Sequence, residues 1–270
     1  MKTVVFCHST TGNTRLAAER ITRGLEAGGG QAHLLDVVDV LRDHQLSEAA
    51  ACVAACDLVG FGSPVQAWKP TATIVDFARA LPLQEGKPAF VFCTHGGQPA
   101  NSLLLLSRTL QERCFRPVAG HALIAEDNWP ILRAVSSRPP TARHPSRAEL
   151  ARLDAFARAL PGLVEAGAPP ADFPFIQSWM HVLGQVITSA YLRRGTGRKK
   201  ADPARCTRCG LCARGCPAQA IRMAPYPEFS GSCVGCWACY NNCPEKAIDS
   251  FVLFGRDGRY RGPRRAAWVL

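Results

Sequence analysis

Eight cysteines between residues 206 and 243 constrain this chain more than any other feature of its sequence. They fall into two runs, C-T-R-C-G-L-C-A-R-G-C-P from Cys206 to Pro217 and C-V-G-C-W-A-C-Y-N-N-C-P from Cys233 to Pro244. Each run has the spacing C-x2-C-x2-C-x3-C-P, and the second follows the first at a constant offset of 27 residues. The match continues into the dipeptide Ala-Ile that follows each run, so the two runs form an internal repeat.

The spacing indicates iron–sulfur chemistry. Three thiolates on a tightly turning loop can reach three corners of a cubane cluster, and a fourth thiolate completes the ligand set. Disulfides are the first alternative, but they need an oxidising compartment, and nothing in the sequence indicates export. Zinc ribbons are the second, but their paired C-x2-C units do not need a third and fourth cysteine with a trailing proline. We therefore predict an iron–sulfur protein.

The stretch from about Ala201 to Ser250 resembles the bacterial-type ferredoxins that carry two 4Fe–4S clusters. In these proteins the fourth cysteine of each run ligates the other cluster. The resemblance implies that one cluster is held by Cys206, Cys209, Cys212 and Cys243. It implies that a second cluster is held by Cys233, Cys236, Cys239 and Cys216.

The amino-terminal segment predicts a phosphate-binding loop between a buried strand, residues 2–7, and a helix at Arg15–Ala27. The loop is Ser9, Thr10, Thr11, Gly12, Asn13 and Thr14. A helix amino terminus attracts anions, hydroxyls donate hydrogen bonds, and glycine lets a ligand approach the backbone. A merely capped helix needs one such hydroxyl, whereas this turn has four. No lysine follows the glycine, so a nucleoside-triphosphate P-loop is excluded.

Alternating strand and helix patterns continue to about residue 164 and predict a parallel sheet covered on both faces. The loop S-T-T-G-N-T matches the one that binds the 5′-phosphate of FMN in flavodoxins, although Cys7 stands where that family usually has an aromatic residue. The resemblance implies a flavodoxin-like, doubly wound α/β fold with five parallel strands. The remaining elements are expected as strands at Gln31–Val38, Asp57–Phe61, Ala89–Cys93 and His121–Ala125, and helices at Ser47–Cys56, Thr71–Ala80, Asn101–Arg113 and Arg147–Val164.

Two further loops follow strands at the same edge of the expected sheet, where such folds bind ligands. In flavodoxins these loops border the isoalloxazine ring. The resemblance therefore implies flavin contacts from Ser63, Pro64, Val65 and Trp68, and from Thr94, His95, Gly96 and Gly97. Two roles remain open for the tryptophan, stacking on the ring or packing beside the next helix. The histidine either hydrogen-bonds the ring or remains in solvent.

The net charge of +11 is concentrated in the carboxyl-terminal part. Residues 1–192 contain 17 Lys or Arg and 16 Asp or Glu, whereas residues 193–270 contain 15 and 5. Nucleic acid is not an expected partner, because no groove-reading motif accompanies the charge. Part of the charge compensates anionic clusters and should raise their potentials. The rest favours an acidic redox partner, with anionic membrane headgroups as the less favoured target.

The order of segments resembles the bacterial flavodoxin–ferredoxin fusion proteins. The expected divisions are a flavodoxin-like FMN-binding domain at 1–166, a linker helix and basic hinge at 167–200, a two-cluster ferredoxin domain at 201–252 and a basic tail at 253–270. An amphipathic helix at Phe173–Leu192 is expected to dock the domains, with a membrane-surface helix as the alternative. Residues 126–145 form a long loop that either covers the flavin or faces a partner, and the tail is either disordered, a cover for a cluster or a docking segment.

The primary functional hypothesis is an electron-transfer flavoprotein that relays electrons between FMN and two 4Fe–4S clusters and exchanges them with a redox partner. No side chain is expected to act as an acid, base or nucleophile. One alternative is an FMN-dependent reductase of a small substrate, which predicts an apolar pocket beside the ring. The other is a ferredoxin on a docking scaffold that binds no flavin.

The amino-terminal apolar run is too short for a signal peptide and no long apolar segment is present, so a cytoplasmic protein is expected. The oligomeric state remains open.

Overall fold

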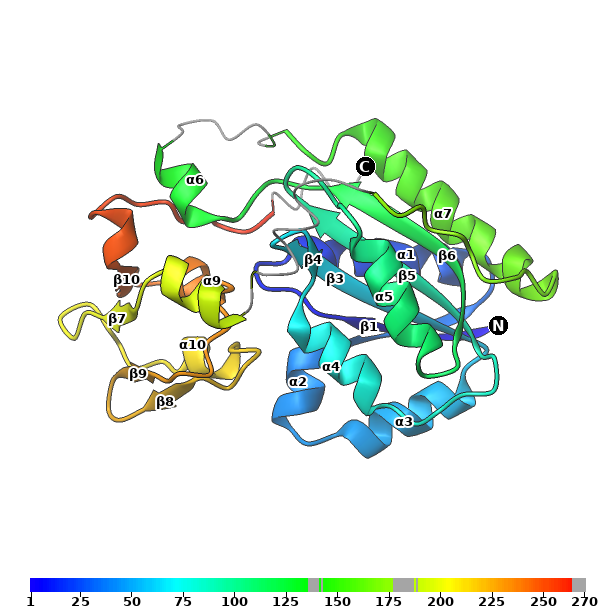
Figure 1. The fold of residues 1–270 in the computed structure, drawn as a ribbon, viewed down its shortest axis with the longest axis horizontal. Coiled ribbons are helices and arrows are strands. Elements are labelled where there is room, and N and C mark those ends of the chain that lie inside the picture. The colour runs from blue at the N-terminus through cyan, green and yellow to red at the C-terminus, as the bar shows by residue number, and fades with distance from the viewer. Residues whose placement is uncertain (136–140, 142, 177–186, 188, 264–270) are drawn as a thin grey trace.

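The computed structural model describes residues 1–135, 141, 143–176, 187 and 189–263. Its amino-terminal part contains a parallel sheet with the strand order β2-β1-β3-β5-β6 (Figure 1). This is the doubly wound order 2-1-3-4-5 of flavodoxin-like folds, so the predicted five parallel strands are confirmed. The strands are β1 (Lys2–Cys7), β2 (Gln31–Asp36), β3 (Leu58–Gln66), β5 (Pro88–His95) and β6 (Arg116–Ile124). A short strand β4 (Lys69–Pro70) pairs antiparallel with the end of β3.

Helices cover both faces of this sheet (Figure 1). One apolar core joins the strands to α1 (Asn13–Ala27) and α7 (Arg147–Glu165). The opposite core joins them to α2 (Val37–Arg42), α3 (Leu46–Ala55), α4 (Ala72–Ala80) and α5 (Ser102–Gln111). The central strands are therefore buried on both sides, as their continuous apolar runs predict.

Strand β2 ends at Asp36, two residues before the predicted end at Val38. The carboxylate of Asp36 accepts a hydrogen bond of 2.9 Å from the backbone N–H of Val38 and caps helix α2. The apolar residues after Asp36 belong to that helix, which the sequence pattern did not reveal because its six residues are too few to show helical periodicity.

The fifth parallel strand, β6, begins at Arg116, five residues before the predicted start at His121. Pro117 and Gly120 are weak strand formers and concealed its first half. The strand lies at the edge of the sheet, and its register with β5 shifts between Ala89 and Phe90. An edge position with a bulge accommodates a proline that a central strand would not.

Residues 126–145 contain a short helix, α6 (Pro130–Val135), within the segment predicted as a loop. Ile131 and Ala134 of this helix pack against a cluster of buried residues from the carboxyl-terminal part, which includes Trp237 and Tyr240. The segment therefore contacts the other half of the same chain.

The carboxyl-terminal part repeats one small unit twice, at the same 27-residue offset as the sequence. Helix α10 (Leu211–Arg214) corresponds to the start of α11 (Ala238–Asn242), and β8 (Ile221–Met223) corresponds to β10 (Ile248–Ser250). The residues preceding the two helices, Gly210 and Trp237, both have a left-handed backbone, with φ of 73° and 62°. Strand β8 pairs with β9 (Pro227–Phe229), and β10 pairs with β7 (Lys199–Ala201). Helix α9 (Ser189–Gly195) precedes the unit, and the 3-10 helix η1 (Phe251–Leu253) follows it.

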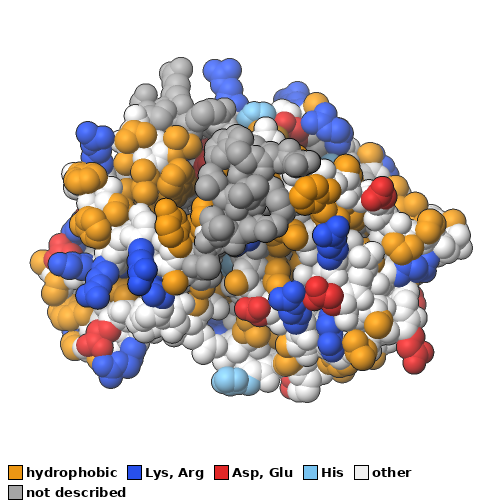
Figure 2. Space-filling model, in the orientation of Figure 1, with side chains coloured by type: hydrophobic (Ala, Val, Ile, Leu, Met, Phe, Trp, Pro, Cys, Tyr) orange, Lys and Arg blue, Asp and Glu red, His pale blue; other side chains and the backbone are white. Residues whose placement is uncertain are grey.

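Most of the predicted connector helix lies outside the described residues. Its predicted start, residues 173–176, is not helical, and the predicted end lies in helix α9 (Ser189–Gly195). The backbone of Ile176 exchanges two hydrogen bonds with the side chain of Asn101, the residue that precedes α5. No helix in the described part of the chain is long and apolar enough to cross a membrane. In the view of Figure 2, Lys and Arg side chains are spread over the carboxyl-terminal half at the left.

Candidate functional site

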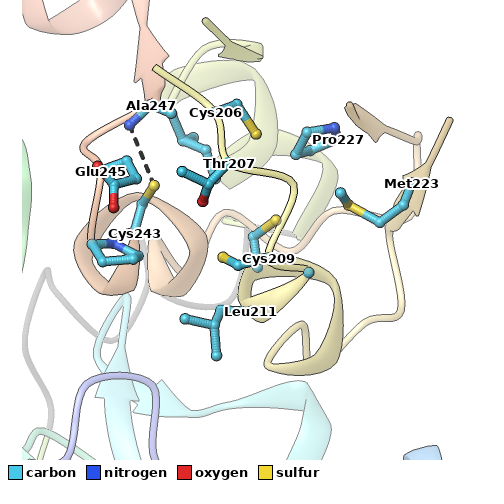
Figure 3. A pocket seen from close by; sticks show the side chains of 13 residues that line it. Cys206, Thr207, Cys209, Leu211, Met223, Pro227, Cys243, Glu245 and Ala247 are labelled. Atoms are coloured by element: carbon cyan, nitrogen blue, oxygen red, sulfur yellow. Dashed lines mark hydrogen bonds between the residues drawn. The ribbon is translucent and has the colours of Figure 1, made fainter. Parts of the chain in front are cut away.

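The first cysteine set surrounds a single cavity. Cys206, Cys209 and Cys212 line it from the loop before α10 and from that helix, and Cys243 lines it from the end of α11. Figure 3 shows Cys243 across the same space from Cys206 and Cys209. These are the four residues that the ferredoxin resemblance assigned to one cluster, and the structure brings them together from both halves of the repeat.

The second set is also gathered from both halves. Cys233, Cys236 and Cys216 lie close enough to Cys239 to raise the pKa of its thiol electrostatically, although burial is the larger cause. Burial likewise raises the pKa of the Cys236 thiol to about 12. Such thiols stay protonated on their own, whereas coordination to iron deprotonates a thiol outright. The donor chemistry therefore fits a cluster of iron.

The repeat extends to the hydrogen bonds of the fourth cysteines. The backbone N–H of Ala220 donates to Sγ of Cys216 over 3.2 Å, and the N–H of Ala247 donates to Sγ of Cys243 over 3.3 Å. Such N–H···S bonds tune the reduction potential of iron–sulfur centres. Within the described residues, no three His, Cys, Asp or Glu side chains converge as they would on one metal ion. The first set instead encloses a space, as the wider spacing of a four-iron cluster requires.

A buried cation lies beside the second cysteine set. Lys199 is 6% exposed, and its ammonium group lies 3.8 Å from the ring centroid of Trp237. It donates hydrogen bonds to the carbonyls of Thr196 and Gly197, at 3.0 and 3.1 Å. No carboxylate in the described part of the chain forms a salt bridge with it. A buried charge normally needs a counter-charge, and an anionic cluster would supply one.

A polar pocket lies at the carboxyl ends of β1, β3 and β5, where doubly wound sheets bind ligands. Its lining includes ten of the predicted FMN-binding residues: Ser9, Thr10, Thr11, Asn13, Thr14, Pro64, Val65, Thr94, His95 and Gly96. Four further residues line it: Ala125, Glu126, Asp127 and Asn128. The last three belong to the long loop expected either to cover the flavin or to face a partner. They follow β6 and carried no recognisable motif.

Two hydroxyls of the predicted phosphate loop have a free proton to donate to an anion. The side-chain amide of Asn128 donates hydrogen bonds to Oγ1 of Thr10 and Thr11, at 3.1 and 2.8 Å. Since these oxygens already accept, their O–H protons remain available to a phosphate. The loop also precedes the 15-residue helix α1, whose first backbone N–H groups form an anion-binding terminus.

The pocket also contains a donor set that fits a flavin. The side chain of His95 lines it, and its Nδ1 atom is buried without a hydrogen-bond partner in the described structure. Burial lowers the pKa of His95, although a backbone hydrogen bond with Gly97 opposes the shift, so the neutral imidazole is favoured. A buried polar atom of this kind needs a partner, which a flavin heteroatom would provide.

Four of the predicted FMN-binding residues do not line the pocket: Gly12 of the phosphate loop, and Ser63, Trp68 and Gly97. Gly12 caps helix α1 with a left-handed backbone, φ 102°. Ser63 is fully buried and accepts a hydrogen bond from the backbone N–H of Thr71. Trp68 is half-buried at the tip of a tight turn between β3 and β4, in which Ala67 and Trp68 both have positive φ. Both roles considered for Trp68 remain predictions.

The ferredoxin-like half contacts the loops around this pocket directly. The side chain of Gln66 donates to the carbonyl of Val234, beside Cys233, over 3.0 Å. The side chain of Asn242, beside Cys243, donates to the carbonyl of Thr10 over 2.9 Å. The two halves therefore meet through residues that are adjacent to two of the cysteines and through residues of the pocket loops.

The described part of the basic tail covers the outside of the phosphate loop. The hydroxyl of Tyr260 donates to Oδ1 of Asn13 over 2.7 Å, and Pro263 lies against Gly12. Residues 264–270 are outside the described structure. Arg259 anchors the tail by stacking on the ring of Tyr240, at 3.9 Å, and by donating to the carbonyls of residues 240, 246 and 248.

The two halves of the chain are similar to different known proteins. Residues 198–244 match the 4Fe-4S dicluster domain family. No curated protein sequence matches the chain significantly.

Solved structures resemble the amino-terminal part. They include a flavodoxin from the domain Archaea, at 19% identity over 61% of this chain and 99% of that one, with a TM-score of 0.44. The rubredoxin oxygen:oxidoreductase of Desulfovibrio gigas is 16% identical over 61% of this chain and 36% of that one, with a TM-score of 0.47. A WrbA-like flavodoxin from Agrobacterium tumefaciens is 18% identical over 61% and 98%, with a TM-score of 0.41.

The assignment of the amino-terminal fold rests on its strand order, and that of the carboxyl-terminal domain on the family match and the repeated cysteine unit. The chain combines a flavodoxin-like α/β domain with a 4Fe-4S dicluster domain.

Proposed function

We propose that this protein is an electron-transfer iron–sulfur flavoprotein. In this proposal the polar pocket holds FMN, and the two cysteine sets hold two 4Fe–4S clusters. When bound, the clusters exchange single electrons and the flavin stores one or two, so the pair can match one-electron and two-electron partners. The chain supplies binding, orientation and a short path between the cofactors.

The contact between Gln66 and Val234 carries the proposal. Val65, the residue before Gln66, lines the pocket, and Cys233, the residue before Val234, belongs to the second cysteine set. One hydrogen bond of 3.0 Å therefore joins the two binding regions. Placing both in one chain makes transfer between them independent of protein concentration.

The composition of the pocket favours an electron carrier over a substrate reductase. A reductase predicts an apolar chamber beside the flavin, whereas the described walls consist mainly of hydroxyl, amide and carboxyl groups from Ser, Thr, Asn, Glu and Asp. Asp127 is partly buried there, and this burial raises the pKa of its carboxyl group.

Cofactor analysis after anaerobic reconstitution tests the proposal. We expect about one acid-released FMN and about eight irons per chain, the sum of one flavin and two cubanes. A reductive titration should bleach both the flavin and the cluster absorption. Iron near that value without bindable FMN would leave a ferredoxin on a docking scaffold.

Two cysteine variants make the iron count specific. Cys236→Ala should lower the iron content to about four per chain, because one cubane loses a ligand. Cys52→Ser is the matched control, since Cys52 is exposed on α3 and outside both sets, and it should keep the full iron content.

A further inference from the structure

A basic groove lies on the ferredoxin-like half, between the α9–β7 connection, the β8–β9 hairpin and η1. Its walls include Arg194, Arg198, Lys200, Phe229 and Phe251, and Cys233 lines it as well. A residue of the second cysteine set is thus part of the groove surface, which gives an approaching molecule a short distance to that set.

The cations of the groove are available to a partner. Arg194, Arg198 and Lys200 are exposed, and none forms a salt bridge with a carboxylate in the described structure. The acidic side chain in the groove, Glu228, is paired with Arg222 at 2.6 Å. The groove therefore presents a field of one sign.

An exposed aromatic side chain lies among these charges. Phe251 is 70% exposed and its ring lies against Gly197, and Phe254, three residues further on, is 86% exposed. An apolar centre with a charged rim is the usual composition of a protein-docking surface. The two rings give this face of the ferredoxin-like half exposed aromatic area beside its cations.

We propose that this groove is the docking surface for an acidic redox protein, which exchanges electrons with the second cysteine set. The inference rests on the proposed function and adds the entry point and the charge of the partner. Positive potential steers an acidic protein to the groove, and Phe251 provides the contact that fixes its orientation. The position of Cys233 favours a redox protein over a membrane surface, since headgroups gain nothing from proximity to a cluster.

Charge reversal tests the surface. The variant Arg194→Glu/Arg198→Glu/Lys200→Glu is compared with Arg147→Glu/Arg152→Glu/Arg158→Glu, which changes the charge equally on exposed residues of α7. The reduced holoprotein is mixed with an oxidised acidic [2Fe–2S] ferredoxin as the probe, and the second-order rate is followed by stopped-flow at low and high salt. We expect the groove variant to lower the low-salt rate about tenfold or more, and the α7 variant to leave it nearly unchanged.

A second measurement does not depend on electron transfer. Association of the oxidised holoprotein with the same probe, followed by fluorescence anisotropy, should weaken in the groove variant. Phe251→Ser should also weaken it, but with an unchanged salt dependence, because it removes apolar area and no charge. Equal effects of the two charge variants, or none in either, would overturn the proposal.

Vesicles containing anionic phospholipid distinguish the other target. If the groove variant loses vesicle binding but keeps the probe rate, the surface is a membrane contact and the docking proposal is wrong. If the proposed electron transfer between the clusters and FMN is wrong, the measurements differ from both of these outcomes. In that case the unmodified protein lacks FMN or clusters, or its flavin is not reduced by its own clusters, whereas the anisotropy result still decides the docking surface.

Discussion

Lys199 is the side chain from which the structure makes its clearest electrostatic prediction. The equivalent position in the sequence repeat, 27 residues later and before the second cysteine run, is the uncharged Tyr226. The buried ammonium lies beside Cys233, Cys236 and Cys239. A nearby positive charge stabilises the reduced, more negative state of a cluster and so raises its potential. Lys199 therefore acts on one cluster site only.

We predict that Lys199→Gln lowers the midpoint potential of one cluster and leaves the other unchanged. A shift of about 59 mV would correspond to a tenfold change in the ratio of reduced to oxidised one-electron centre. An EPR-monitored redox titration of the holoprotein measures both clusters. Lys200→Gln, an exposed neighbour in the same strand, is the control, and Lys199→Arg should restore most of the shift. Equal shifts in the two Gln variants would show that Lys199 has no special role.

His8 gives a pH-dependent prediction. It is fully buried, and its Nδ1 atom lies 2.7 Å from Oγ1 of Thr71, the residue that precedes helix α4. Burial lowers the pKa of His8 from 6.5 to about 4. The unfolded chain therefore binds the proton first, and the stability that depends on a neutral His8 is lost as the pH falls from 6.5 towards 4.

We expect the free energy of unfolding to fall by about 1 kcal/mol more in the unmodified protein than in His8→Gln, between pH 7 and pH 5.5. Urea unfolding followed by circular dichroism at the two pH values measures the difference within each protein. The intrinsic cost of the substitution cancels in this comparison. The same pH dependence in both proteins would contradict the prediction.

At the scale of elements, the contact between α1 and α7 depends on a glycine. A Cβ atom placed on Gly24 of α1 would lie 2.9 Å from Cβ of Ala157 in α7. The two helices thus approach more closely than side chains at this position would permit. Gly162 of α7, in contrast, has no atom within 4 Å of its Cβ position.

The two helical glycines should respond in opposite directions to the same substitution. Gly24→Ala should destabilise the domain by about 1–3 kcal/mol, because the helices must separate. Gly162→Ala should stabilise it by about 0.5–1 kcal/mol, because alanine has the higher helix propensity. Thermal unfolding of the two variants provides the measurement. Stabilisation by both would mean that the helices are free to move apart.

Strands with long apolar runs could be predicted from the sequence because burial on both faces leaves a simple pattern. Strand β1 has the predicted bounds, and the predicted segments of β3 and β5 lie almost entirely within the observed strands. The short antiparallel strand β4 could not be predicted. Its turn uses Ala67 and Trp68 with positive φ, where glycine or asparagine would have marked it.

The candidate site was predictable only where its residues belong to a motif. The cysteine sets and the hydroxyl loop have fixed spacing, so each could be assigned from local sequence. Asn128 orients that loop from more than 110 residues away and follows no pattern. Contacts of this kind depend on how the finished domains pack, which propensity and periodicity do not describe.

At the scale of the whole molecule, one hydrogen-bonded network links helix α11 to the phosphate loop. The side chain of Asn241 donates to the carbonyl of Asn128 over 3.1 Å and accepts from the backbone N–H of Tyr260 over 2.9 Å. Asn128 and Tyr260 in turn bond to the loop. Because α11 contains Cys239 and ends beside Cys243, assembly of the clusters should affect the loop.

We predict that removal of the clusters weakens FMN binding by about tenfold, a coupling within the usual range for linked sites. Fluorescence titration of FMN with reconstituted and chelator-treated protein measures the two affinities. Asn241→Ala should reduce the difference between them, since it breaks the link without touching either site. Identical affinities in the two forms would show that the domains bind their cofactors independently.

The bond between Tyr260 and Asn13 joins residues 247 positions apart, and this separation orders events during synthesis. At about 5–20 residues per second, the phosphate loop leaves the ribosome roughly 12–50 seconds before the segment that covers its outer side. The sheet and α1 can fold in that interval, whereas the cover cannot yet exist. A nascent chain stalled before residue 240 should therefore present the phosphate loop without its outer cover, and the loop gains that cover only when translation is nearly complete.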